Sequence, residues 1–203
     1  MGFEALIDNY VWVDAIEGWT VSVMGPRRTD ELVRIFGRGQ AVPLGEVACT
    51  DVDRLRGPDT GAVEPFLQVA QFNEYTVAFE RDGWSGAFPE IARRCSAAGG
   101  WFFSVYWNVN AAGFVTRAVD GVITAQFESL YPLAPAGRPG ERRPEWAIGP
   151  EVGSGVVWQA CMALLEQETG IAVQRGWLGE PWPTFRIPEP YHLYGDIEGA
   201  DRI

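Results

Sequence analysis

The chain has 203 residues and is 47% apolar, which is the length and apolar content of a single globular domain. It carries a net charge of −11, with sixteen arginines, no lysine, one histidine and three cysteines. The lack of lysine excludes Schiff-base chemistry and a phosphate-binding P-loop, a single histidine excludes a histidine-rich metal site, and the negative charge disfavours nucleic-acid binding.

The cysteines and the hydropathy pattern indicate the compartment in which the protein occurs. Cys49, Cys95 and Cys161 are odd in number and widely spaced, which argues against a disulfide framework and a thiolate metal site. Charged or polar residues interrupt every apolar stretch, so each stretch is much shorter than the roughly 18 residues that a helix needs to span a bilayer. We therefore expect a cytoplasmic protein with no metal, cofactor or membrane contact.

The first third of the chain predicts a strand, a helix and a long connection. Residues 19–23 (WTVSV) are typical of a strand that stops at Gly25-Pro26. Thr29 begins an amphipathic helix that ends at Gly37. Residues 38–64 have little periodicity, and we expect a long connection with one short strand near residues 45–50.

The middle of the chain predicts a hairpin, a helix and a central strand. Residues 66–80 predict a hairpin folded about Asn73-Glu74. Apolar residues at helical spacing between residues 88 and 95 predict an amphipathic helix, and Gly99-Gly100 marks its end. Residues 101–109 (WFFSVYWNV) predict a strand with one apolar and one mixed face.

Residues 114–128 contain the clearest local signal, an Asp120-Gly121 pair between two β-forming runs. This dipeptide is typical of a two-residue type I′ hairpin, whose turn sets the strand register. The predicted partners are Val119 with Val122, Ala118 with Ile123, Thr116 with Ala125, and Phe114 with Phe127.

The remaining sequence predicts a mobile surface loop over residues 131–150, a helix over residues 153–169 and a Pro-rich tail anchored by aromatic residues. These elements predict an α+β fold with a mainly antiparallel sheet and about three helices packed on one face. We expect one domain over residues 1–203, with a core at about 10–172 and an extended tail at about 173–203.

Several segments resemble a domain-of-unknown-function family that is widespread in actinobacteria, especially Streptomyces relatives. The most specific are Glu80-Arg81-Asp82-Gly83, Asn108-Val109-Asn110-Ala111, and residues 118–128. The resemblance covers most of residues 10–190. The family has no established activity, so the resemblance implies a bacterial host and a compartment but no chemistry.

Two glutamates are candidate catalytic residues. Glu80 and Glu128 each follow a phenylalanine at the end of a predicted strand, and a carboxylate beside aromatic rings can have the raised pKa that acid/base catalysis requires. The alternative is that both are solvated residues at strand ends.

A second group suits ligand binding. Tyr106, Trp107, Asn108 and Asn110 place amide donors at the end of an aromatic strand, which suits recognition of a planar polar ligand. Turn formation explains the asparagines equally well. Arg117 is a further candidate, as a partner for one of the glutamates.

These features favour an acidic domain that binds a protein or peptide partner, in an immunity-like or regulatory role, because the catalytic inventory is small and the charge suits a basic partner. The alternative is a cofactor-free isomerase, cyclase or hydrolase that acts on a small molecule with a buried carboxylate in an aromatic pocket. A third possibility is a structural subunit with a large apolar patch.

Overall fold

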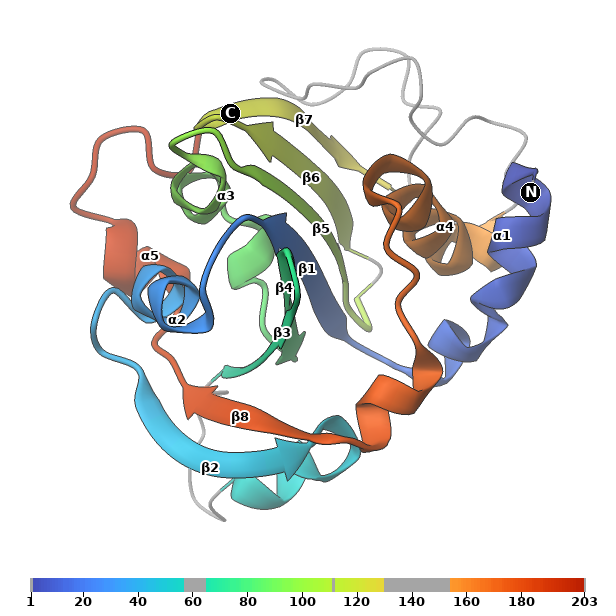
Figure 1. Ribbon diagram of the computed structural model, residues 1–203, viewed down its shortest axis with the longest axis horizontal. Helices are drawn as coiled ribbons and strands as arrows, with labels where there is room; N and C mark the ends of the chain where they lie inside the picture. Colours follow the sequence, from blue (N-terminus) through green and yellow to red (C-terminus); the bar gives the residue numbers. More distant parts are fainter. Residues whose placement is uncertain (1, 57–64, 111, 130–153, 203) are drawn as a thin grey trace.

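The computed structural model describes residues 2–56, 65–110, 112–129 and 154–202. Its centre is an eight-stranded antiparallel sheet with the strand order β2-β8-β3-β4-β1-β5-β6-β7 (Figure 1). The strands are β1 (Trp19–Gly25), β2 (Val42–Ala48), β3 (Phe66–Phe72), β4 (Tyr75–Arg81), β5 (Trp101–Trp107), β6 (Gly113–Val119), β7 (Val122–Glu128) and β8 (Pro181–Arg186). The predicted α+β class and antiparallel sheet are confirmed.

The helices cover both faces of this sheet. They are α1 (Phe3–Asn9), α2 (Thr29–Gly37), α3 (Pro89–Ser96), α4 (Val157–Thr169) and α5 (Pro190–Tyr194). In Figure 1, α1 and α4 lie on one side, and α2, α3 and α5 lie on the other. The prediction of helices on one face was therefore wrong. Two helices, α1 and α5, were not predicted.

The two faces arise from the alternation of side chains along each strand. In β5, Phe103, Val105 and Trp107 enter a core that they share with α4, while Phe102 enters a second core with α2 and α3. The face that the sequence shows as mixed is thus buried as well. Both faces need a helical cover, because each carries large apolar side chains that would otherwise contact water.

The hairpin of β6 and β7 has the predicted turn and a shifted register. Asp120 and Gly121 both have positive φ angles, 48° and 78°, as a type I′ turn requires. Val119 pairs with Val122 and Ala118 with Ile123 as predicted, but a bulge follows, so Arg117 pairs with Ala125. The predicted pairs beyond the bulge were wrong: Thr116 pairs with Gln126, and Phe114 with Glu128.

The prediction of an extended tail over residues 173–203 is also wrong, because this segment contains a strand and a helix. Strand β8 lies between β2 and β3, and α5 follows it. Prolines disfavour a strand that is paired on both sides, because proline has no backbone N–H. However, β3 pairs with β8 only at Thr184, Phe185 and Arg186, so Pro181 and Pro183 lie outside the stretch that is paired on both sides.

The other predicted elements can be compared one by one. The strand at 19–23, the hairpin at 66–80 and the helices near 29–37, 88–95 and 153–169 are confirmed as β1, β3 with β4, α2, α3 and α4. The short strand expected near 45–50 is β2, and it begins at residue 42. The predicted surface loop at 131–150 falls outside the described residues.

Candidate ligand-binding cavity

A cavity of about 510 Å³ opens where β4 and β5 end and the chain enters α5. Four of the five residues that the sequence marked for ligand binding line it, namely Tyr106, Trp107, Asn108 and Asn110. Val109 of the same run also lines it, and four other segments contribute one residue each: Gly18, Arg56, Asp82 and Glu189. The structure thus brings most of the predicted binding cluster into one hollow.

The cluster residues have different roles. The Asn108 side chain accepts hydrogen bonds from the backbone N–H groups of Asn110 and Ala112, at 3.0 and 3.1 Å. Asn108 therefore stabilises the turn after β5, which is the alternative role that the sequence indicates for it. Trp107 is 1% exposed, and its indole donates to the Ile16 carbonyl. Its side chain is part of the core, so Trp107 supports the cavity wall.

Tyr106 is a half-buried polar residue of this cavity. Its hydroxyl accepts a hydrogen bond from the Asn108 amide at 2.7 Å. The hydroxyl can still donate its own proton to a ligand. Burial raises the pKa of Tyr106, so the hydroxyl keeps that proton at neutral pH.

Two carboxylates and one guanidinium give the cavity its charge. Arg56 donates to Asp82 at 2.7 Å and to Asp53 at 3.1 Å, so its charge is already compensated. Glu189 accepts a hydrogen bond from the Trp84 indole at 2.7 Å. Among the described residues, Glu189 forms no ion pair with an arginine or histidine.

Sequence reasoning missed Arg56, Asp82 and Glu189 as lining residues. Glu189 stands between Pro188 and Pro190, and Pro190 opens helix α5. Proline is favoured at the first helical position, and that signal could have placed the residue before it, Glu189, at a helix end. Nothing in the sequence indicates that this helix end lies beside β5.

A row of aligned residues that includes Tyr106 crosses the sheet from the cavity. The strand registers align Glu80 of β4, Thr20 of β1, Tyr106 of β5, Phe114 of β6 and Glu128 of β7. Four inter-strand steps separate the two glutamates, roughly 19 Å at about 4.8 Å a step. Their positions do not suit a catalytic pair that acts on one bond.

Glu80 is fully buried in this row and does not line the cavity. One of its carboxylate oxygens accepts the backbone N–H of Ser85 at 2.9 Å, and the other accepts that of Gly86 at 2.7 Å. Burial raises the pKa of Glu80 to about 7, against the opposing effect of these hydrogen bonds. Glu80 is therefore an internal carboxylate that titrates near neutrality.

Glu128 and Arg117 lie away from the cavity. Glu128 is buried at the edge of the sheet and accepts the backbone N–H of Gly113 at 2.9 Å. Arg117 points to the opposite face, where it lies 3.6 Å from Glu168 of α4 and donates to Thr124. The predicted contact between Arg117 and one of the candidate glutamates does not occur.

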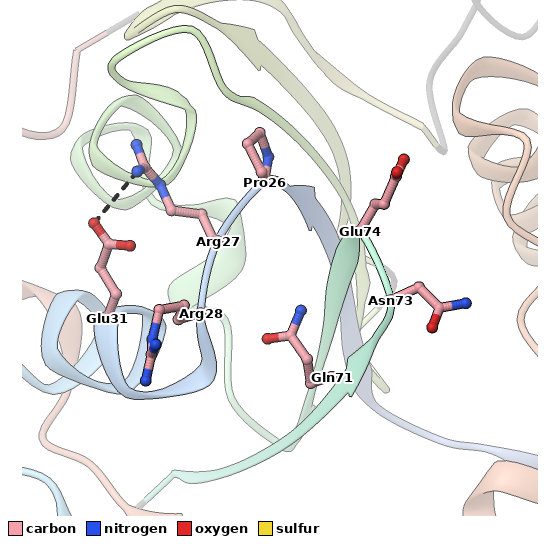
Figure 2. A pocket seen from close by; sticks show the side chains of 7 residues that line it. All are labelled: Pro26, Arg27, Arg28, Glu31, Gln71, Asn73 and Glu74. Atoms are coloured by element: carbon pink, nitrogen blue, oxygen red, sulfur yellow. Dashed lines mark hydrogen bonds and ion pairs between the residues drawn. The ribbon is translucent and has the colours of Figure 1, made fainter.

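Two further hollows meet at the turn between β3 and β4, and both are lined by Pro26, Asn73 and Glu74. The larger has a volume of about 690 Å³ and includes Tyr75 and Trp101. Figure 2 shows the smaller, where Arg27 and Glu31 pair with each other. The Arg27–Glu31 pair compensates two of the charges of the smaller hollow, and Glu74, which lines both hollows, is exposed to solvent. The cavity at Tyr106 has a half-buried carboxylate instead, so we take it as the stronger ligand site.

Comparisons with known proteins give no relatives: no protein-family model, curated protein or solved structure matches this chain. In the described ranges, no group of three His, Cys, Asp or Glu side chains is placed to hold a metal ion. Within the same ranges, no helix is long and apolar enough to cross a bilayer.

Proposed function

We propose that this protein is a binding module that recognises a protein or peptide partner by accepting one of its basic side chains into the cavity at Tyr106. The observation that carries this proposal is the half-buried Glu189 carboxylate, which lines the cavity without a cationic partner among the described residues. A guanidinium or ammonium group of a partner would supply that missing charge.

The rest of the cavity supports the same occupant. The Tyr106 ring and the aliphatic side chain of Val109 provide apolar surface for the methylenes of an arginine or lysine side chain. The net charge of −11 favours approach of a basic partner from a distance, beyond the contacts in the cavity itself.

The rival proposal is an enzyme that uses Glu80 as an acid or base. Its support is the pKa of about 7, which suits proton transfer at neutral pH. Against it, Glu80 has no exposed surface, and both of its oxygens are occupied by backbone N–H groups. We therefore prefer binding to catalysis.

The test is calorimetric titration with blocked tripeptides, Ac-Gly-Xaa-Gly-NH2, in which Xaa is Arg, Lys or Gln. We expect the Arg and Lys peptides to bind and the Gln peptide to bind at least fivefold more weakly. We also expect Glu189→Gln to weaken arginine binding about fivefold, which corresponds to roughly 1 kcal/mol for one partly exposed charge pair.

The matched control is Glu74→Gln, which removes the same charge from the exposed turn between β3 and β4. It should leave arginine binding unchanged, because Glu74 does not line this cavity. Equal binding of the Arg and Gln peptides, or equal effects of the two variants, would contradict the proposed function.

A further inference from the structure

The loop between β4 and α3, residues 82–88, is pinned to the sheet by buried hydrogen bonds. Besides the two bonds from Ser85 and Gly86 to Glu80, the Thr20 hydroxyl donates to the Gly83 carbonyl at 2.6 Å. The Ser104 hydroxyl donates to the Gly86 carbonyl at 2.7 Å. The Gln126 amide donates to the Ala87 carbonyl at 2.8 Å. Among these buried partners in the sheet Glu80 alone can carry a charge, and hydrogen bonds to a charged acceptor are the stronger kind.

The same loop carries part of the cavity. Asp82, which lines the cavity, is its first residue, and Trp84 lies directly before the two residues that Glu80 holds. The Trp84 indole in turn donates to the Glu189 carboxylate at 2.7 Å. Glu80 is therefore connected to Glu189 by hydrogen bonds to Ser85 and Gly86, by the adjoining residue Trp84, and by the hydrogen bond from the Trp84 indole.

We propose that Glu80 is a positioning residue for the cavity: its carboxylate fixes the loop whose Trp84 indole orients Glu189 for a basic ligand. This inference rests on the proposed function for the identity of the ligand. The coupling between Glu80, Trp84 and Glu189 can be measured without any ligand.

Titration of Glu80 should report this coupling. The titratable groups that interact with it electrostatically are Glu189 from the segment before α5, Tyr106 from β5 and Cys95 from α3, and none is a cation. When Glu80 takes up a proton, one oxygen becomes a hydroxyl and is a poorer acceptor for a backbone N–H. The loop should therefore be held best above pH 7, where the carboxylate is charged.

The sign for stability is opposite. Because the pKa of Glu80 is higher in the folded chain than its ordinary value, its contribution to stability is greatest below that ordinary value and falls as the pH rises through about 7. Glu80→Gln imitates the protonated acid, so this pH dependence should be lost in the variant. Ligand affinity and stability should thus move in opposite directions across this range.

The experiment is a pH titration from 5.5 to 8.5 followed by nitrogen–proton NMR of the whole chain, with the Trp84 indole signal assigned from Trp84→Phe. We expect the Trp84 indole and the Ser85 and Gly86 amides to shift with a common midpoint near pH 7 in the wild type and to stay constant in Glu80→Gln. We also expect Glu80→Gln to weaken Ac-Gly-Arg-Gly-NH2 binding about threefold at pH 8, with the Glu74→Gln control unchanged.

The outcomes separate the two proposals. A Trp84 signal that does not titrate in the wild type overturns the positioning role, whether or not Glu80→Gln folds. A wild type in which Trp84 titrates but no arginine peptide binds supports the coupling and contradicts the proposed function. A Glu80→Gln variant that folds, titrates flat and binds the peptide as tightly as the wild type overturns the positioning role.

Discussion

At the scale of single residues, the loop after β4 depends on a glycine as much as on Glu80. A Cβ atom on Gly86 would lie 2.2 Å from the Ser22 hydroxyl oxygen and 2.8 Å from the Thr20 methyl carbon. The loop backbone thus packs directly against β1, and no larger residue fits without movement. This close approach allows the Gly86 N–H to reach Glu80.

We therefore predict that Gly86→Ala destabilises the fold by about 2 kcal/mol, the usual cost of forcing a methyl group into a packed interior. Gly176→Ala is the matched control, because nothing lies within 4 Å of its added Cβ. Urea unfolding of both variants gives the comparison. Equal stabilities would mean that the loop can move away from β1 at little cost.

At the scale of elements, local sequence signals predicted the turns and most helices. Features that depend on tertiary contacts, such as the bulge in the β6–β7 hairpin, were not predicted. Asp120-Gly121 specifies a two-residue turn by its backbone preferences alone. The bulge just beyond Ala118 has no such signal, yet it brings Gln126 opposite Thr116, where the Gln126 amide donates to the Thr116 hydroxyl and to the Ala87 carbonyl. Because Ala87 lies 39 residues from Gln126 in the sequence, a local sequence pattern cannot predict this contact.

The candidate site shows the same division. The run from Tyr106 to Asn110 could be predicted because its residues are neighbours in sequence, and they do line one cavity. Glu189 and Arg56 reach that cavity from segments 50 residues or more away, through the sheet topology. Of the two interpretations of Glu80, a carboxylate with a raised pKa or a solvated residue at a strand end, the second is wrong, because β4 is an interior strand and the loop after it covers the carboxylate.

Removal of residues 177–203 tests the place of the C-terminal elements. This truncation deletes β8 from between β2 and β3 and removes Trp182, Leu193 and Tyr194 from the two cores. We predict loss of cooperative thermal unfolding, because three large buried side chains and two strand pairings disappear together. A truncated chain that still melts cooperatively would show that these elements only rest on a stable core.

At the scale of the whole molecule, one end of the sheet is covered on the face of α2 and α3 by the segment after β4, which holds only a single-turn 3-10 helix, Ser85–Ala87, in place of an α-helix. On the face of α2 and α3, the apolar rows near Met24 and Phe102 are covered by helices, while the row of Thr20 and Tyr106 is covered by the loop after β4. The cavity lies at this end, beside a loop held by a titrating carboxylate. Recognition and loop order are therefore expected to be linked.

The central claim, that a cation binds in the cavity at Tyr106, is tested most directly by mapping amide and indole NMR shifts during titration with Ac-Gly-Arg-Gly-NH2. The account predicts that the largest shifts fall on Asn108, Asn110 and the Trp84 indole, and that Glu189→Gln moves the midpoint of these shifts to an about fivefold higher peptide concentration. Shifts centred instead on Arg27, Asn73 and Glu74, where the other hollows lie, would contradict it.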